Sequence, residues 1–274
     1  MTVTTASPSD PIARRGGVSA MLAGIRPLFK KDIREWRHGV RIWVVLVVTA
    51  LFMCLAAANG WIQTWVIANV PEAAASADKV ISMAPMDNLL IAAGSQIFVI
   101  AAIFASMSLL VSERDRGTLA WVASKPVSRT SIWISKFASA TVVLWVVAGI
   151  VPIALTGIVL AVLYGAPSIT GLVLIALGIG AAIALFVAVV LAASTLAPSQ
   201  PAVAAIAFAV FFLPSILGAI VPFAIQPFFP TSILDWAAGL AIGANVGFVT
   251  PIAWLVAIVA LAAFSARRME RLDL

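Results

Sequence analysis

Apolar residues run along this chain in stretches of about twenty, separated by short polar segments. Stretches such as 142–151 and 172–196 are apolar on every helical face, and they lack the strict alternation of a membrane β-strand. About twenty helical residues, at 1.5 Å each, cross a hydrocarbon layer of about 30 Å. The pattern predicts an all-α integral membrane fold with six transmembrane helices, at about residues 41–59, 88–111, 138–163, 171–196, 202–225 and 250–266.

A different periodicity precedes the first predicted span, over residues 21–40. Apolar residues recur there at spacings of three and four, while Lys and Arg occupy the other faces. This predicts a basic amphipathic helix lying along the membrane surface, preceded by a disordered cytoplasmic tail over residues 1–20. The pattern leaves two roles open: a lipid anchor, or in addition a docking face for a cytoplasmic partner through Asp32, Arg34 and Glu35.

Residues 112–137 form the longest charged connection between predicted spans on one side of the membrane. Gly117 and Thr118 can open a short helix, and Pro126 ends it. Ser128 then caps the helix that becomes the third span. The short helix carries a small apolar stripe: Leu119, Val122 and Ala123. We expect a surface helix joined rigidly to two spans, which suits it to transmit a push from a bound protein; an ordinary cytoplasmic turn is the alternative.

Residues 231–250 precede the last predicted span. A seventh span here would place Asp235 near hydrocarbon, at a cost of about 2.5–3.5 kcal/mol. We therefore predict an interfacial or re-entrant half-helix on the outer side, with Ser232 as its N-cap. Glycines at 239, 243 and 247 recur every four residues and would allow a close approach to a neighbouring helix.

Composition and charge agree with a membrane protein and set its orientation. The chain of 274 residues is 63% hydrophobic and 10% charged, which excludes an ordinary soluble domain. Of its 17 Lys and Arg residues, 16 lie up to the start of the first span, in 112–137, or after 266. Since such residues stay cytoplasmic, both termini, including the tail 267–274, are predicted on the cytoplasmic side of the cell membrane. These charges sit beside spans, so we expect contact with membrane lipid and none with nucleic acid.

Several chemistries lack the residues that they need. The chain has no GxxxxGK[ST] phosphate loop, one cysteine (Cys54) and one histidine (His38), which gives no support to nucleotide binding, a metal site or a catalytic triad. The predicted spans carry no charged residue in their interior, where ion-coupled carriers generally need one. We predict a protein that is not an enzyme and holds no cofactor; a non-transporting scaffold and a secondary carrier or channel remain as alternatives.

The charged connection resembles the signature loop of ABC type-2 transporter permeases. The resemblance rests on the run ERDRGTL from Glu113 to Leu119, the run SKPVSR from Ser124 to Arg129, and Lys136 before the third span. Ser135 stands where the family usually has glycine. The order of elements is also similar: an amphipathic helix, six spans, a short outer loop after the third, and an outer half-helix before the last.

The resemblance implies a permease subunit that pairs as a homodimer or heterodimer, each copy docking one cytoplasmic ATP-binding-cassette ATPase that binds ATP and Mg²⁺. It implies that the loop is a coupling helix, with Gly117, Thr118, Leu119 and Val122 in a groove of the ATPase. Glu113, Arg129 and Lys136 would brace the helix ends, and Asp32, Arg34 and Glu35 would add contacts. Similar loops occur in drug or antibiotic exporters and in copper-enzyme-maturation permeases. Because the predicted spans carry no charge in their interior, we expect export of an amphiphilic, lipid-like or drug-like substrate.

Overall fold

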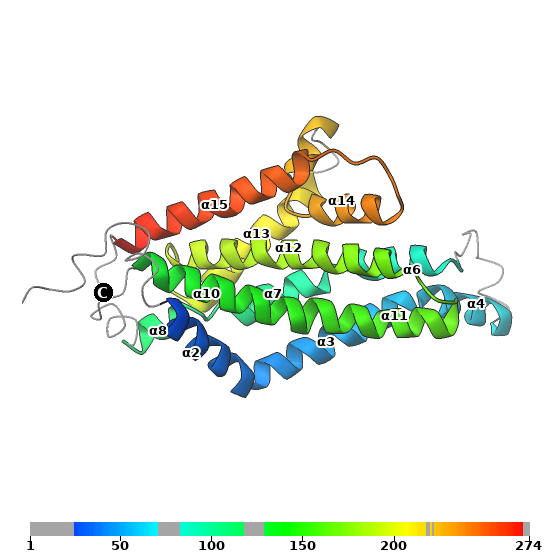
Figure 1. The fold of residues 1–274 in the computed structure, drawn as a ribbon, viewed down its shortest axis with the longest axis horizontal. Helices are drawn as coiled ribbons and strands as arrows, with labels where there is room; N and C mark the ends of the chain where they lie inside the picture. Colours follow the sequence, from blue (N-terminus) through cyan, green and yellow to red (C-terminus); the bar gives the residue numbers. More distant parts are fainter. Residues whose placement is uncertain (1–24, 71–82, 118–128, 218–219, 221, 271–274) are drawn as a thin grey trace, which may run out of the picture.

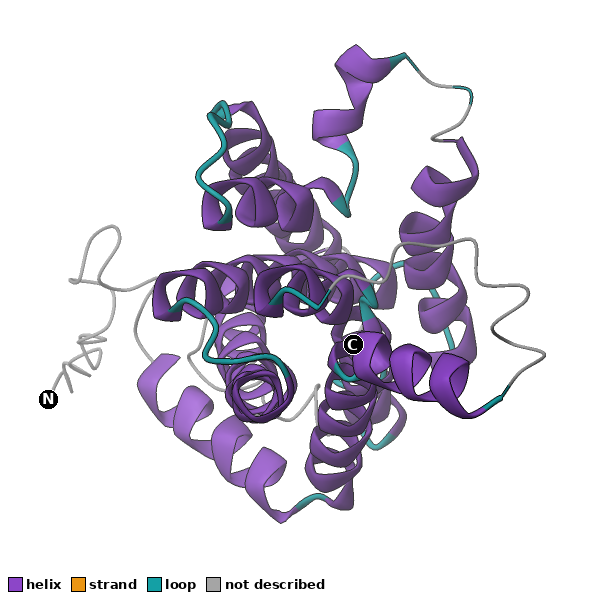
Figure 2. Ribbon diagram, turned by 90° about the vertical axis from the view of Figure 1, so that its right-hand side faces the viewer, coloured by secondary structure: helices purple, strands orange, loops and turns teal. Residues whose placement is uncertain are grey.

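The protein is all-helical over the part of the chain that its structure, a computed structural model, describes: residues 25–70, 83–117, 129–217, 220 and 222–270. Figure 2 shows helices and no strand in these residues. In chain order the helices are α2 (Ile25–His38), α3 (Val40–Ala57), α4 (Asn59–Asn69), α6 (Pro85–Gly94), α7 (Ile97–Ser106), α8 (Val111–Asp115), α10 (Arg129–Leu144), the π-helix η1 (Trp145–Ile150), α11 (Val151–Leu163), α12 (Ile169–Ser194), α13 (Gln200–Leu217), the 3-10 helix η2 (Phe223–Phe228), α14 (Ser232–Ala241) and α15 (Val249–Glu270).

Five helical runs among the described residues are long and apolar enough to cross a membrane. They are Val40–Ala57, Pro85–Asp115, Thr130–Leu163, Ile169–Ser194 and Val249–Arg268. They form an elongated bundle with α2, α8 and the end of α15 at one end and α4 at the other (Figure 1). The all-helical, multi-pass class predicted from the apolar stretches is therefore confirmed.

α12 is the central helix of the bundle. It packs against α7, α10, α13, α14 and α15. Of its most apolar 18 residues, 67% are buried, compared with 17% of the corresponding residues of α15. Its buried side chains include Ile183 and Phe186. Because lipid tails are as apolar as these side chains, such a helix is held by close packing and dispersion.

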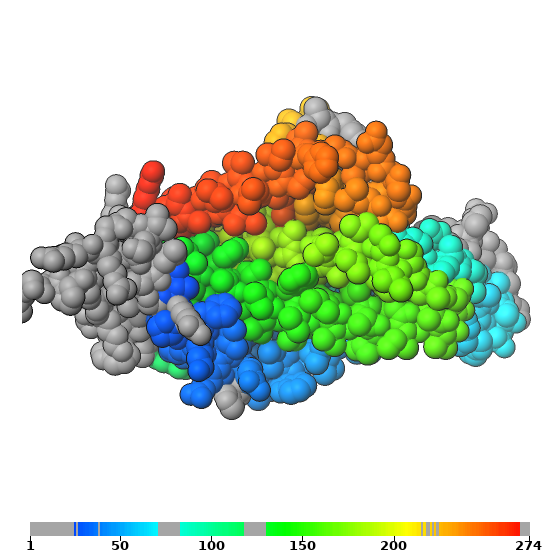
Figure 3. All heavy atoms as spheres, in the orientation of Figure 1, coloured from blue at the N-terminus to red at the C-terminus, as the bar shows by residue number. Residues whose placement is uncertain are grey.

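α2 lies on the outside of the bundle against α10, blue on green in Figure 3. Its faces follow the predicted amphipathic pattern, since Trp36 is buried while Lys30, Arg34 and Arg37 are exposed. Gly39 separates α2 from α3. The placement of this helix at a membrane surface stays a prediction.

The second and third spans are interrupted, which their apolar content alone did not reveal. α6 ends at Gly94, and Gln96 has a φ of 50°, in the left-handed region, before α7 begins. In the third span the π-helix η1 stands immediately before α11, whose first turn holds Pro152. Proline has no N–H, so the hydrogen bonds of a helix must shift around it.

The fifth predicted span, 202–225, is shorter in the structure. The apolar part of α13 covers Gln200–Pro214, which is about 22 Å at 1.5 Å per residue. A hydrocarbon layer is about 30 Å thick. Pro214 lies inside α13 and Pro222 precedes η2, and neither residue can donate the N–H that a continuing helix needs. The lengths of the described helices therefore do not confirm a sixth span.

α14 occupies part of the region where a half-helix was expected, and its details differ from the prediction. Ser232 does not cap it: the Ser232 hydroxyl donates to the carbonyl oxygens of Pro227 and Phe229, each at 2.8 Å. The close helix contact comes from α12, where a Cβ on Gly178 would lie 2.5 Å from the Cβ of Ala237. Gly243 and Gly247, which the spacing pattern had singled out, face open space.

Candidate coupling site

The structure describes the base of the predicted coupling segment rather than its tip. Five predicted site residues lie in segment 118–128, outside the described residues: Thr118, Leu119, Val122, Pro126 and Ser128. α8 leads into this segment and α10 follows it, beginning at Arg129. Gly117, at the end of the described range, has a φ of 68°. A residue with a side chain adopts this left-handed backbone conformation at a cost of about 1–2 kcal/mol, which explains a glycine at this turn.

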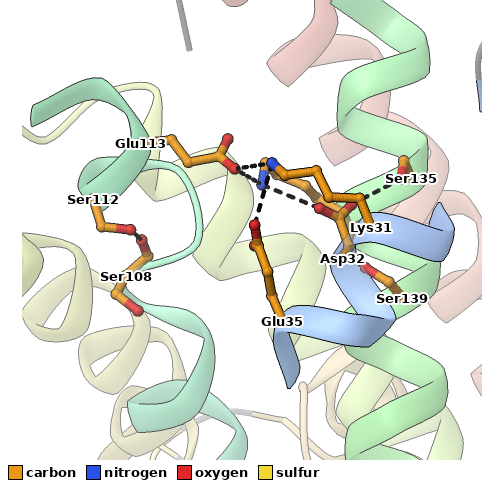
Figure 4. A network of polar contacts seen from close by, with 9 residues as sticks. Lys31, Asp32, Glu35, Ser108, Ser112, Glu113, Ser135 and Ser139 are labelled. Atoms are coloured by element: carbon orange, nitrogen blue, oxygen red, sulfur yellow. Dashed lines mark hydrogen bonds and ion pairs between the residues drawn. The ribbon is translucent and has the colours of Figure 1, made fainter. Parts of the chain in front are cut away.

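Four charged residues from three helices meet at this base (Figure 4). Lys136 Nζ on α10 lies 2.9 Å from Glu113 Oε1 on α8 and 3.9 Å from Asp32 Oδ1 on α2. Lys31 Nζ lies 3.2 Å from the same Glu113 oxygen. We call Lys31, Asp32, Glu113 and Lys136 the base cluster. It joins the two sides of segment 118–128 to each other and to α2.

The base cluster is largely shielded from solvent. The side chains of Lys136, Asp32 and Glu113 are 6%, 8% and 13% exposed. Ser135, the residue that departs from the family's glycine, donates its hydroxyl to Asp32 Oδ2 at 2.8 Å. A buried pair of this kind adds little net stability over an apolar contact, but removal of one partner leaves an uncompensated buried charge. The cluster therefore ties α2, α8 and α10 together through charges that depend on one another.

The environment shifts two of these groups in the same direction. Burial raises the pKa of Asp32 above its ordinary value, although Lys136 and Ser135 favour the carboxylate. Burial by itself would lower the pKa of Lys31, but Glu113, Glu35 and Asp32 together outweigh it, so the pKa of Lys31 is raised. Lys31 thus remains an ammonium at neutral pH.

α8 is also bonded to the turn between α12 and α13. Arg114 Nη2 donates to the carbonyl oxygen of Ala197 at 3.1 Å and to that of Pro198 at 2.7 Å. Sequence reasoning missed this contact, and it missed the part that Lys31 and Ser135 play in the base cluster. The family resemblance had pointed to Arg129 and Lys136, which follow the loop in the chain, and not to Arg114, which precedes it. No periodicity in the chain indicates which carbonyl groups an arginine will contact.

The three residues predicted to dock a partner from the amphipathic helix are placed differently. Arg34 and Glu35 are exposed on α2. Asp32 is buried and bonded within the chain. As placed, the Asp32 carboxylate faces Ser135 and Lys136 of α10 and does not point toward a partner.

Carboxylate oxygens of Asp32, Glu35 and Glu113 lie within 4.8 Å of one another, close enough to bind a metal ion. The ammonium groups of Lys31 and Lys136 already lie against these oxygens. A divalent cation would have to displace both lysines and would meet their positive charge. The arrangement therefore suits an ion-pair network better than a metal centre.

A comparison with known families agrees with this part of the chain. A model of the ABC-2 family transporter protein family matches residues 26–234, a range that contains the base cluster and segment 118–128. The chain belongs to the ABC-2 transporter family. No curated protein matches it. Membership makes the chain a membrane permease subunit of an ABC transporter, not itself an ATPase, and implies association with an ATP-binding-cassette ATPase in a dimeric arrangement.

The ABC-2 permease also has an apolar groove between α12, α13 and α15, with a volume of about 550 Å³. Its walls include Leu185 of α12, Leu196 of the turn after α12, Val210 of α13 and Phe264 of α15. Trp254 of α15 lines it as well, and the buried Trp254 Nε1 finds no hydrogen-bond partner among the described residues. A buried N–H without an acceptor costs about 1–3 kcal/mol.

Proposed function

We propose that the permease is the membrane half of an ATP-driven exporter and that segment 118–128 takes up the motion of its ATPase. The base cluster carries this proposal. Glu113 and Lys136, on either side of the segment, are joined at 2.9 Å, and Lys136 also contacts Asp32. A segment whose two ends are tied to three helices moves those helices when it is pushed. The partner subunit would bind ATP and Mg²⁺, and this chain would bind no cofactor.

The contacts with the ATPase are assigned from the family's loop. Gly117, Thr118, Leu119 and Val122 would enter a groove of the ATPase. On the far side of the loop, Pro126, Ser128 and Arg129 would set the direction in which α10 begins. Arg34, exposed on α2, would add a contact from the amphipathic helix.

The proposed topology has six crossings, with α13 and the chain through η2 forming the fifth. Both termini would then lie in the cytoplasm, and two permease chains would form the pathway. The distribution of Lys and Arg supports this orientation. It is also supported by the position of α2 and the end of α15 at the same end of the bundle (Figure 1).

The groove between α12, α13 and α15 supports an amphiphilic, lipid-like or drug-like cargo. Its walls are almost wholly apolar, which suits a chain or ring system rather than an ion. Trp254 Nε1 would donate to one oxygen of the cargo once the cargo has displaced the side chains that cover it. The variant Trp254→Phe keeps the ring and removes the donor, so transport of an oxygen-bearing amphiphile should fall several-fold, about the loss of one hydrogen bond. Equal transport by both forms would contradict this role.

The deciding experiment is purification of the tagged chain from its native membrane in mild detergent, followed by mass spectrometry and an ATP-hydrolysis assay. We expect a near-stoichiometric ATP-binding subunit with the wild type. It should be lost with Leu119→Asp, which puts a charge in the apolar stripe, and retained with the control Ser9→Asp in the N-terminal tail. A chain free of ATPase in several detergents, or transport that persists after ATP depletion, would contradict the proposal and favour a scaffold or a secondary carrier.

A further inference from the structure

A second cavity, of about 140 Å³, lies beside the base cluster. It is enclosed by α2, the first turn of α3, the corner between α7 and α8, and α10. The volume corresponds to roughly five water molecules at about 30 Å³ each, which is the size of a small polar group. Its charged and hydroxyl lining residues are Asp32, Glu35, Arg41, Ser108, Ser112, Lys136 and Ser139.

The two sides of this cavity differ in chemistry. On one side the Arg41 guanidinium donates to Ser108 Oγ, and the Ser112 hydroxyl lies beside them, donating to the Ser108 carbonyl oxygen. A guanidinium next to hydroxyl groups is a common binding arrangement for a phosphate group. On the other side Glu35 and Asp32 project from α2 (Figure 4). Asp32 already faces Lys136, whereas Glu35 is 60% exposed and, among the described residues, pairs only with Lys31 at 3.4 Å, a weak surface pair, so the Glu35 carboxylate can also accept an ammonium group.

The charges of the lining balance. Arg41 and Lys136 contribute two positive charges, and Asp32 and Glu35 contribute two negative charges. A ligand that carries one phosphate and one ammonium group would leave this balance unchanged. A purely anionic ligand would meet the carboxylates of α2 without a cation of its own to offset them.

An apolar row leads away from the cavity along α3. Arg41 is followed at spacings of three and four by Val44, Val47, Leu51 and Leu55, which lie on one face of the helix. All four are more than half exposed, at 54%, 60%, 60% and 56%. An exposed apolar row that begins at a cationic polar cavity matches a molecule with a charged head and a hydrocarbon tail.

We propose that this cavity binds the head group of a zwitterionic phospholipid with a primary amine. The phosphate would lie against Arg41, Ser108 and Ser112, the ammonium against Glu35, and an acyl chain along the exposed face of α3. A lipid in this position would lie between α2 and the α7–α8 corner and would support the base cluster from the membrane side. The proposal concerns a lipid of the surrounding membrane and is independent of the transported cargo.

The test is native mass spectrometry of the purified full chain, with dioleoylphosphatidylethanolamine or dioleoylphosphatidylglycerol added to the delipidated protein. The wild type should retain one ethanolamine lipid per chain and prefer it to the glycerol lipid by about tenfold, the effect of one charge-assisted contact. Arg41→Gln should weaken both lipids, and Glu35→Gln should abolish the preference alone. Arg37→Gln removes an exposed charge of α2 outside the cavity and is the control; it should change neither affinity.

Three results would overturn the proposal: equal retention of the two lipids by the wild type, equal effects of Arg37→Gln and Arg41→Gln, or full displacement by soluble phosphoethanolamine at the lipid's own concentration. The last result would show that the tail contributes nothing. Ser112→Ala removes a single hydroxyl and leaves the charges in place. It should weaken the ethanolamine lipid by a few-fold even if Arg41→Gln fails to fold.

Discussion

Lys136 is shared between two carboxylates, one on α8 and one on α2. Its side chain is 6% exposed, so water cannot replace it as a partner for either group. Lys31 also contacts Glu113, but it is itself 43% exposed and does not pair with Asp32 at comparable distance. We therefore expect the Lys136 ammonium group to contribute most to the stability of the base cluster.

Replacing Lys136 by methionine keeps the length of the side chain and removes the charge. Glu113 and Asp32 are then left buried without their common cation, and we expect a loss of about 3–5 kcal/mol in the free energy of unfolding. The measurement is the thermal unfolding midpoint of the purified permease. Lys30→Met, at an exposed position on α2, is the matched control and should change it little.

The double variant Asp32→Asn with Lys136→Met tests whether the two residues act as a pair. Asparagine removes one of the stranded carboxylates, so the double variant should be more stable than Lys136→Met alone, with a coupling of about 0.5–3 kcal/mol. The same unfolding assay measures it. Additive losses from the two substitutions would show that Asp32 and Lys136 do not interact.

The raised pKa of Asp32 predicts how stability depends on pH. A folded-state pKa above that of the unfolded chain means that the folded protein takes up the proton first on acidification. The resulting stabilisation is present below the unfolded pKa and is lost as the pH rises through the folded pKa. The stability of the wild type relative to Asp32→Asn should therefore increase between about pH 7 and about pH 4. A constant difference across this range would mean that the pKa of Asp32 is unshifted.

At the scale of elements, the third span is fixed to α12 by a tryptophan at its π-helical turn. Trp145 Nε1 donates to the Ala176 carbonyl oxygen at 2.8 Å. Gly180 provides the space for this ring, because a Cβ there would lie 2.6 Å from Trp145 Nε1. The Trp145 ring of the π-helical turn thus packs into the space that Gly180 leaves on α12.

Substitution of Gly180 by alanine should displace the Trp145 ring and break its hydrogen bond. Overpacking of this kind costs about 1–3 kcal/mol, which should lower the thermal unfolding midpoint. Gly247→Ala is the control, because Gly247 has no atom near its would-be Cβ. If both variants unfold at the wild-type temperature, the contact between Trp145 and Gly180 is not close in solution.

For the whole molecule, long apolar stretches sufficed to predict an all-helical membrane fold. Backbone groups in lipid must be bonded within a helix or between the strands of a closed barrel, and these stretches lack the alternation of barrel strands. The base cluster could be anticipated only in part. The family's loop pointed to Glu113 and Lys136, but hydrophobic periodicity does not tell which charges meet across helices. Asp32 was predicted on a docking face, and its burial follows from the packing of α2 on α10. The turn at Gln96 was not predicted, although Gly94, Ser95 and Gln96 interrupt the apolar stretch there.

The proposed crossing by α13 predicts that residues 166 and 268 lie on opposite sides of the membrane. In a Cys54→Ser background, Ala166→Cys lies in the turn before α12 and Arg268→Cys lies near the end of α15; both positions are exposed. A membrane-impermeant maleimide should label residue 166 in intact cells and residue 268 only after permeabilisation. Labelling of both from the same side would mean an even number of crossings between them and would exclude α13 as a span.

The bond from Arg114 to the α12–α13 turn links the apolar groove between α12, α13 and α15 to α8, which leads into the proposed coupling segment. Leu196 lines the groove, and the carbonyl groups that Arg114 holds belong to the next two residues, Ala197 and Pro198. Arg114 itself precedes Gly117 by less than one helical turn. A molecule that widens the groove would therefore shift the backbone that anchors the proposed coupling segment. In this way a permease with bound cargo could signal to the ATPase before the cargo crosses the membrane.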